Sequence, residues 1–270
     1  MFALSMVLRF KNTAIHYHQW GNGPVALLCF HGIGQDGRAF APFGNALDSR
    51  FTIYSFDLFY HGQTACLHGD AYAQNERLTP DNWTAILTAF LDEKNICRFS
   101  VAGFSMGGVF ALATVQAFAG RVDELWLLAP DGITTNAWYR FATGSGFGRA
   151  VFRFFLDRLP LLRHVSNGLV KAGLLDRSLV RFAQSTLATP DQRERVYRSW
   201  VAFRPLRLPL QTLAHTLNAH PIRIRVFLGT FDRVLPPEAV QPLFLVLPTA
   251  QEVLLPVGHN RLIEVVSQLP

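Results

Sequence analysis

The chain has 270 residues, of which 50% are hydrophobic and only 16% are charged, and its formal net charge is +6. This length fits one large domain with a substantial core, and the composition excludes a disordered or collagen-like chain. A basic chain can attract nucleic acid, but this sequence contains no zinc finger or RNP1-type motif, so we expect no nucleic-acid partner.

The N-terminus and the cysteines predict a cytoplasmic location. The stretch MFALSMVLRFKN has no basic segment ahead of an apolar core, unlike a secretory signal, and no apolar run reaches the roughly 18 residues of a membrane-spanning helix. Cys29, Cys66 and Cys97 show neither metal-binding nor CxxC spacing. We therefore expect reduced thiols, with Cys29 and Cys97 buried as small hydrophobic residues.

The first segments in chain order predict a β-hairpin followed by a buried strand. Residues 6–10 and 14–20 have the composition of two strands, and a polar turn at Lys11-Asn12 joins them. Residues 25–30, VALLCF, are continuously apolar, which is typical of a strand that helices cover on both faces. The same signal recurs at residues 51–56, 97–104, 122–129, 222–229 and 251–257.

Helix-like segments separate these strands, so we expect an α/β fold with a mostly parallel, eight-stranded sheet. The expected helices are residues 39–47, 80–94, 106–119, 237–246 and 260–268. Thr79 before Pro80 forms a credible N-cap, with proline at the first helical position. Strands that alternate with helices indicate parallel pairing with helices on both faces, and functional groups then lie beyond the carboxyl ends of the strands.

The alternation stops at residues 131–220, which we expect to form a helical insertion. The catalytic domain would then comprise residues 1–130 and 221–270. The insertion has apolar residues three and four apart, and we expect prolines 160, 190, 205 and 209 to break it into pieces. Its 13 Arg or Lys against 5 Asp or Glu leave a net charge of +8. Most of its apolar residues should pack on the catalytic domain, but a weak contact with an anionic membrane surface is a further expectation.

The segment VAGFSMGG, residues 101–108, places Ser105 between Gly103 and Gly107, after a predicted strand and before a predicted helix. This is the G-x-S-x-G pattern of a sharp turn that exposes a serine hydroxyl. A serine hydroxyl is a weak nucleophile at neutral pH and needs a neighbouring base. Ser105 is therefore a candidate nucleophile if a histidine and a carboxylate follow other strands.

Two later strands lead into such groups. Asp232 follows the strand at residues 222–229 and His259 follows the strand at residues 251–257, which gives the chain order Ser, Asp, His. We expect His259 to act as general base and then general acid, and Asp232 to hold its tautomer. The expected donors of the oxyanion hole are the backbone N–H groups of Ile33, in a Gly-rich turn, and Met106, at a helix N-terminus.

These motifs together resemble the α/β-hydrolase fold family, and the resemblance covers nearly the whole chain outside the insertion. The matching segments are FHGIG, DLFYHGQT, GFSMGG, GTFDRVLPP and VGHNR. The resemblance implies a triad of Ser105, Asp232 and His259, an oxyanion hole built by the HG loop, and a helical lid after the sixth strand.

One feature departs from the family pattern, and another leaves the identity of the triad acid open. Phe59-Tyr60 stands where many relatives have Pro-Gly, which affects the shape of the loop but no catalytic group. Asp131 follows the sixth strand, a position from which some family members draw the triad acid. We favour Asp232 as the acid and keep Asp131 as the alternative.

The expected function is hydrolysis of a carboxylic ester, with a small or medium apolar acyl or alcohol part, through an acyl-enzyme. A thioesterase, lactonase, aminopeptidase or carbon–carbon bond hydrolase would use the same residues, and a slow-turnover small-molecule receptor is an alternative on the same fold. No nucleotide-binding motif is present, so we expect no cofactor, and we also expect no metal. The protein would be a monomer or a homodimer that acts on a small molecule.

Other polar residues at the predicted strand ends have structural interpretations. We expect the side chains of His31 and His61 to anchor loops, and Asp57 to brace a loop through backbone hydrogen bonds. The pair His16-x-His18 lies on an alternating strand and needs no metal ion to explain it.

Overall fold

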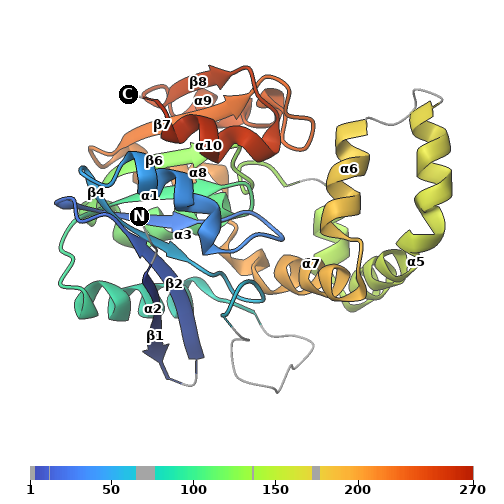
Figure 1. Cartoon of the computed structure of the whole chain (residues 1–270), viewed down its shortest axis with the longest axis horizontal. Helices are drawn as coiled ribbons and strands as arrows, with labels where there is room; N and C mark the ends of the chain where they lie inside the picture. The colour runs from blue at the N-terminus through green and yellow to red at the C-terminus, as the bar shows by residue number, and fades with distance from the viewer. Residues whose placement is uncertain (1–3, 12, 65–76, 136, 172–176, 270) are drawn as a thin grey trace.

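The computed structural model describes residues 4–11, 13–64, 77–135, 137–171 and 177–269, with the backbone alone between residues 160 and 179. The described strands form one eight-stranded sheet in the order β1-β2-β4-β3-β5-β6-β7-β8 (Figure 1). The strands are β1 (Leu4–Phe10), β2 (Thr13–Trp20), β3 (Val25–Phe30), β4 (Phe51–Phe56), β5 (Phe99–Phe104), β6 (Val122–Leu128), β7 (Arg223–Gly229) and β8 (Gln251–Leu255).

The strand pairing agrees with the sequence-based prediction. β1 pairs with β2, and β2 with β4, in antiparallel register, whereas every neighbouring pair from β4 to β8 is parallel. The central strand β5 is buried at all six positions because helices cover both of its faces. This double coverage explains why the central strands are continuously apolar rather than alternating.

Helices cover the sheet on both faces. On one face α2 (Pro80–Glu93), α3 (Gly107–Phe118), α8 (Leu210–Asn218) and α9 (Gln241–Val246) share a core with the strands. The other face is covered by α1 (Ala41–Ala46) and α10 (Leu262–Ser267). The mostly parallel α/β architecture predicted from the sequence is therefore confirmed.

Three of the predicted helices are shorter than expected, while the start of α2 is as predicted. The Thr79 hydroxyl accepts a hydrogen bond from the Asn82 N–H at 3.2 Å, which caps α2. Each shortened helix is preceded by a 3₁₀ segment, a common way to begin a helix. These segments are Gly37–Phe40 before α1, Pro237–Ala239 before α9 and His259–Arg261 before α10.

The chain between β6 and β7 is helical, as predicted, and most of it stands apart from the sheet. We call α4 (Ala137–Gly144), α5 (Gly146–Lys171), α6 (Arg177–Thr186) and α7 (Pro190–Ala202) the inserted helices. α5, α6 and α7 lie to the right of the sheet in Figure 1, whereas α8, which also falls within residues 131–220, packs against α3.

The prolines of the insertion act differently from one another. Pro190 is the first residue of α7, where a missing N–H costs nothing, and Thr189 and Gln192 form a capping box there. α5 continues through Pro160, so the prediction that this proline breaks a helix is wrong. One proline removes one hydrogen bond, which the remaining turns of a 26-residue helix can compensate.

The cysteine prediction is half right. Cys29 is buried in β3, as expected of a strand covered on both faces. Cys97 is exposed, which contradicts the prediction, because β5 begins only at Phe99 and leaves Cys97 in the preceding loop. Cys66 lies outside the described residues.

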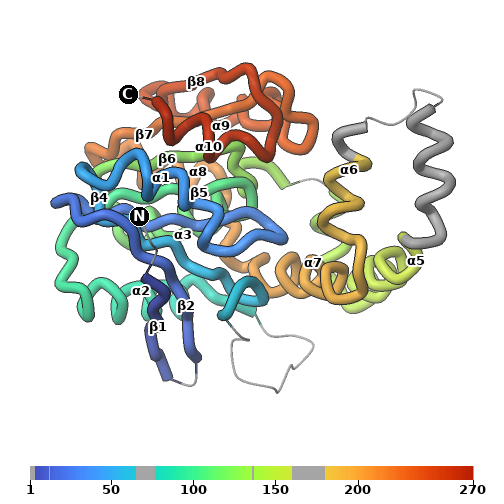
Figure 2. The backbone as a smooth tube through the Cα atoms, viewed as in Figure 1, coloured from blue at the N-terminus to red at the C-terminus, as the bar shows by residue number. Residues whose placement is uncertain are grey.

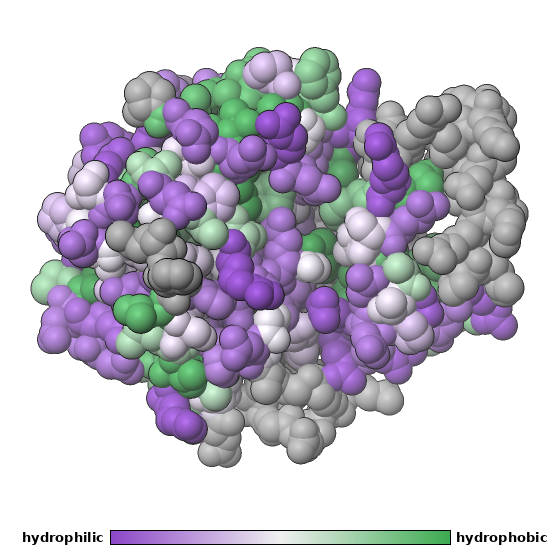
Figure 3. All heavy atoms as spheres, in the orientation of Figure 1, coloured by the Kyte–Doolittle hydropathy of each residue, from purple (hydrophilic) through white to green (hydrophobic). Residues whose placement is uncertain are grey.

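The edge strands of the sheet are β1 and β8, which Figure 2 shows on opposite sides of the sheet. In Figure 3 hydrophobic residues gather at the top, over the C-terminal elements. Among these elements, α9 carries the exposed Leu245 and β8 the exposed Leu254. Among the helices of the described residues, none combines the length and the apolar character needed to cross a bilayer.

Candidate active site

Ser105 lies in a sharp turn between β5 and α3. Its φ angle of +51° is unusual for a residue with a side chain, and such strain persists only where the surroundings hold the backbone. The Ser105 N–H donates to the Leu128 carbonyl at 2.9 Å. The Ser105 carbonyl accepts from the N–H groups of Gly108 at 2.8 Å and Asp131 at 2.9 Å. The end of β6 therefore holds the turn in place.

The two glycines that flank Ser105 are required by close backbone approach. A Cβ atom on Gly107 would lie 1.9 Å from the carbonyl oxygen of Phe30, at the end of β3. A Cβ atom on Gly103 would lie 2.5 Å from the carbonyl oxygen of Gly107. A side chain at Gly107 would push α3 away from β3, and one at Gly103 would push α3 away from β5, so either change would displace the serine that lies between them.

A row of hydrogen bonds connects Asp232, His259 and Ser105. His259 Nδ1 lies 2.6 Å from Asp232 Oδ2, and His259 Nε2 lies 3.1 Å from Ser105 Oγ. Because an ionised carboxylate only accepts hydrogen bonds, Nδ1 donates, and in the neutral ring Nε2 is left as the acceptor for the serine hydroxyl. The structure thus brings together the three side chains that the sequence predicts as a triad, all of them buried.

The carboxylate and the imidazole of this row are each held by further contacts. Asp232 Oδ1 accepts from the N–H groups of Val234 at 2.8 Å and Leu235 at 2.9 Å. The His259 ring lies 4.8 Å from the ring of Phe104 and 5.8 Å from that of Phe182, measured between centroids. These contacts restrict both side chains to the orientation in which they are hydrogen-bonded.

Asp131, the alternative acid, has a different partner. The Arg207 guanidinium binds it through two nitrogens, with Nη1 2.9 Å from Oδ1 and Nη2 on Oδ2, and the Gly132 N–H donates to Oδ1 at 2.8 Å. Burial opposes the charge on Arg207, but the neighbouring carboxylate outweighs it, so the pKa of Arg207 is raised. The bond that holds His259 Nδ1 comes from Asp232 rather than Asp131.

The loop that carries Ile33 is tied to the loop after β4 by two imidazoles. His31 Nδ1 donates to the Gly32 carbonyl at 2.7 Å, and His31 Nε2 accepts from the Leu58 N–H at 3.0 Å. From the other loop, His61 Nε2 accepts from the Gly34 N–H at 3.1 Å. The residues on both sides of Ile33 are therefore held by histidine side chains, as the loop-anchoring interpretation predicts.

The backbone donors predicted for the oxyanion hole belong to residues that line the same cavity as Ser105. Ile33 and Met106 both line the cavity into which Ser105 opens, and Met106 immediately precedes the first turn of α3. Neither N–H group donates a hydrogen bond to a described residue. Their use as oxyanion donors remains a prediction.

Ser105 lies between two cavities. The first, of about 180 Å³, is lined by Ile33, Ser105, Met106, Val109, Asp131, Tyr139, Phe182, Ser199, Trp200, Phe203, Arg207, Val234 and Leu235. The second, of about 200 Å³, is lined by Gly32, Ile33, Gly34, Gln35, Phe104, Ser105, Phe182, Ser185, Thr186, His259 and Asn260. We call them the first and second cavities. His259 lines only the second cavity, whereas Asp131 and Arg207 line only the first.

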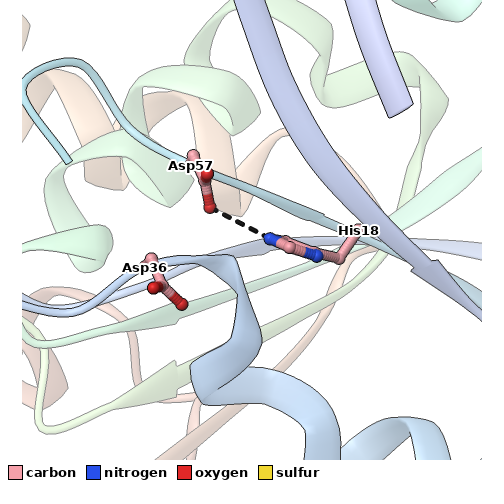
Figure 4. A group of neighbouring side chains, drawn as sticks. All are labelled: His18, Asp36 and Asp57. Carbon is pink, nitrogen blue, oxygen red and sulfur yellow. Dashed lines mark ion pairs between the residues drawn. The ribbon is translucent and has the colours of Figure 1, made fainter. Parts of the chain in front are cut away.

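His18, Asp36 and Asp57 form a cluster at the base of the same loops (Figure 4). Each offers a metal-ligating atom, but the carboxylates already accept hydrogen bonds from the protein. Asp57 accepts from the N–H groups of Gly37 at 2.8 Å and Gln63 at 2.7 Å and lies 3.3 Å from His18 Nε2, while Asp36 binds the Arg38 guanidinium. Asp57 thus braces the loop as predicted, and the guanidinium disfavours a cation at this place.

Several residues that line the cavities were not predicted from the sequence. Tyr139, Phe182, Ser199 and Arg207 come from the segment between β6 and β7 and form no motif with one another or with the catalytic candidates. The only sequence signal near them is the basic, amphipathic character of the insertion. Their positions depend on how these helices pack.

Comparisons with known proteins agree with this architecture. A family model described as the alpha/beta hydrolase fold matches residues 25–264. An uncharacterized protein of Mycobacterium tuberculosis is 28% identical over 249 residues, which cover 86% of this chain and 68% of that protein.

Two solved structures share the fold. The thioesterase domain from the curacin biosynthetic pathway has a TM-score of 0.67 at 18% identity, with 99% of this chain and 98% of that chain covered. A thermophilic esterase from Thermogutta terrifontis has a TM-score of 0.65 at 17% identity, with 99% and 96% covered. With the family match over most of its length and a sheet of the same kind, this chain belongs to the α/β-hydrolase fold family.

Proposed function

We propose that the protein is a serine hydrolase that cleaves a carboxylic ester with a small acyl part through an acyl-enzyme. The observation that supports this proposal most directly is the continuous row of hydrogen bonds from Asp232 through His259 to Ser105. A base that accepts the serine proton and a carboxylate that orients the base are what a hydroxyl nucleophile needs.

The proposed reaction has two steps. Ser105 Oγ attacks the ester carbonyl carbon while His259 Nε2 takes its proton, and the carbon–oxygen bond to the alcohol breaks as His259 returns that proton to the alcohol. Water then attacks the acyl-enzyme, again with His259 as base, and releases the acid and free Ser105. Asp232 stays ionised and stabilises the imidazolium that forms in each step.

The developing negative charge would be held by the N–H groups of Ile33 and Met106. Met106 precedes α3, a helix of 12 residues, so its N–H lies at the positive end of the helix dipole. Loss of one such donor typically costs about 10²- to 10³-fold in turnover. The histidines that hold Gly32 and Gly34 would keep the Ile33 N–H in position for this purpose.

The two cavities can be assigned to the two parts of the ester. The alcohol must leave within reach of the protonated His259, and His259 lines the second cavity but not the first. We therefore place the alcohol in the second cavity and the acyl group in the first. At about 180 Å³ the first cavity is smaller than typical drug-sized sites of roughly 300–1,000 Å³, which favours a short acyl group.

Similarity to an esterase and a thioesterase supports acyl transfer as the reaction class. The residues of the row would also serve a thioester, because the attacked carbonyl carbon is equivalent and only the leaving atom differs. A thioester substrate therefore belongs in the test of function.

The test combines labelling of the nucleophile with turnover. We expect a fluorophosphonate to label the protein, and Ser105→Ala to abolish both the labelling and nearly all hydrolysis of p-nitrophenyl esters. Rates should collapse as the acyl chain outgrows the first cavity, whose volume admits a group about the size of a benzene ring. The rate of hydrolysis of a thioester that carries the favoured acyl group, set against the rate for the matching ester, compares sulfur and oxygen as leaving atoms.

Ser267→Ala provides the control, because Ser267 is a buried serine on α10 whose hydroxyl bonds to the Glu264 carbonyl at 2.7 Å. This variant should keep wild-type turnover. Hydrolysis that survives in Ser105→Ala would refute the proposal. A labelled Ser105 without turnover on any ester or thioester would instead favour the receptor alternative.

A further inference from the structure

Ser199 lines the first cavity. It lies on α7, the residue is 1% exposed, and its buried Oγ has no hydrogen-bond partner among the described residues. A buried hydroxyl without a partner typically costs about 1–3 kcal/mol. Such a group in a native protein calls for an explanation, and because the residue lines the same cavity as Ser105, a ligand is one.

The charges around this hydroxyl cancel. Asp131 and Arg207 line the same cavity and are paired with each other, so they add no net charge to the wall. The Arg207 guanidinium also lies over the ring of Tyr139, 4.1 Å from its centroid, and the Tyr139 hydroxyl donates to the Trp200 carbonyl at 3.0 Å. An anionic ligand would meet Asp131 and a cationic ligand would meet Arg207, so the wall favours a neutral polar group.

The rest of the cavity limits the size and the polarity of its occupant. Its remaining lining is mainly apolar, with Ile33, Val109, Phe182, Trp200 and Phe203 among the residues that form it. An engineered apolar cavity of about 150 Å³ holds benzene, so about 180 Å³ admits a group of roughly that size. The occupant is thus mostly apolar and compact, with one hydrogen-bonding group.

We propose that the first cavity binds an acyl group about the size of a benzene ring that carries a neutral hydroxyl or carbonyl oxygen, and that the Ser199 side chain rotates so that its Oγ hydrogen-bonds to this oxygen. The proposal rests on the function proposed above, because it assigns the acyl group to this cavity. It narrows the substrate from any short ester to an oxygenated one and makes Ser199 a specificity-determining residue.

The test uses esters that differ only in one hydroxyl. The p-nitrophenyl esters of phenylacetic acid, 3-hydroxyphenylacetic acid and 4-hydroxyphenylacetic acid have nearly equal size. The two hydroxylated isomers place the hydroxyl at two different positions in the cavity. We expect the better hydroxylated ester to have a kcat/KM at least about fivefold above that of the phenylacetate, the value of one good hydrogen bond. In Ser199→Ala this ratio should fall to about one.

Ser100→Ala is the matched control. Ser100 lies in β5, is buried, and also has no partner for its Oγ among the described residues, but it does not line either cavity. Both serine-to-alanine changes should raise the melting temperature, because each removes a buried hydroxyl without a partner. Only Ser199→Ala should change the ratio of the two esters, and this separates recognition from a stability effect.

The outcomes distinguish this proposal from the function on which it rests. Ser105-dependent hydrolysis with equal kcat/KM for all three esters, or a preference that survives in Ser199→Ala, would overturn the role of Ser199 and leave the hydrolase in place. A lower melting temperature of Ser199→Ala would show that the hydroxyl serves the fold. Absence of any Ser105-dependent hydrolysis would overturn both proposals.

Discussion

Two buried histidines hold the loop of the candidate oxyanion hole, and they do so in the neutral form. His31 and His61 each donate through Nδ1 and accept a backbone N–H through Nε2. A protonated ring has no acceptor, so protonation would break the bonds from Leu58 and Gly34. Burial is the main reason that the pKa of His31 is lowered to about 4 and the pKa of His61 to about 3.

These lowered pKa values predict a loss of stability in mild acid. The unfolded chain, with a histidine pKa of about 6.5, binds protons before the folded chain does, so the stabilisation is complete above pH 6.5 and is lost as the pH falls toward 4. At pH 5 the loss relative to pH 7 should be about 2 kcal/mol for each imidazole. Urea unfolding at the two pH values measures it.

Two variants separate the buried imidazoles from other titrating groups. His61→Gln should be less stable than the wild type at pH 7 but should lose less stability between pH 7 and pH 5. His215→Gln, at an exposed histidine on α8, should keep the full pH dependence. A pH dependence that is undiminished in His61→Gln would contradict the prediction.

The inserted helices present one face to the cavity and another to solvent. On α4, Tyr139 points inward, whereas Trp138 and Phe141 are exposed. With Phe147, Phe154 and Phe155 of α5 they form an exposed aromatic patch, whose rings are in contact with one another. Four arginines and one aspartate give residues 137–159, which carry this patch, a net charge of +3.

This patch sharpens the sequence-based expectation of a weak contact with anionic membranes. Aromatic side chains beside arginines suit an anionic lipid interface, where the rings enter the headgroup region and the cations meet the phosphates. We expect the protein to cosediment with phosphatidylglycerol vesicles and much less with phosphatidylcholine vesicles. The double variant Phe147→Ser, Phe154→Ser should reduce the bound fraction several-fold.

Leu245→Ser is the control for this prediction, because Leu245 is 84% exposed on α9, away from the inserted helices. It removes an exposed apolar side chain and should leave vesicle binding unchanged. Equal binding to both kinds of vesicle, or equal loss in the double variant and the control, would count against the patch.

Across the whole molecule, an ion cluster joins strands at the end of the sheet opposite Ser105. Glu124 on β6 is buried and binds Arg50 at 2.5 Å, Arg223 at 2.6 Å and Arg225 at 3.3 Å. Its other contact is the Trp126 indole N–H, at 2.9 Å. Because these strands are parallel, the cluster lies at their amino ends, far along the strands from the catalytic candidates.

Loss of the central carboxylate should destabilise the fold without changing the site. Glu124→Gln leaves three arginines without their shared anion. Because Arg50 and Arg223 are exposed to solvent, which screens their charge, we expect a loss of only about 2 kcal/mol in the free energy of unfolding. Asp123→Asn, which breaks the exposed pair with Arg98, should cost less than about 1 kcal/mol. Urea unfolding and esterase assays check both; an equal loss in the two variants would contradict this interpretation.

Much of this protein is readable from its sequence because the determinants are local. Strands covered on both faces must be continuously apolar, as VALLCF in β3 is. The turn that carries Ser105 must have glycine at 107, where α3 approaches β3, and at 103, where β5 approaches α3. The carboxyl ends of parallel strands meet at one edge of the sheet, so the positions of Ser105, Asp232 and His259 after their strands predict that they come together.

The sequence by itself thus determined the α/β architecture, its eight strands and the set of residues that converge on Ser105. Only the tertiary structure decided that His259 pairs with Asp232 while Asp131 pairs with Arg207, and that Ser199 lines the same cavity as Ser105. The physical reason is that these contacts join elements far apart in the chain. The first contact follows from how the loops after β7 and β8 meet, and the other two follow from how α7 and the segment before α8 pack, which no periodicity or motif in the sequence encodes.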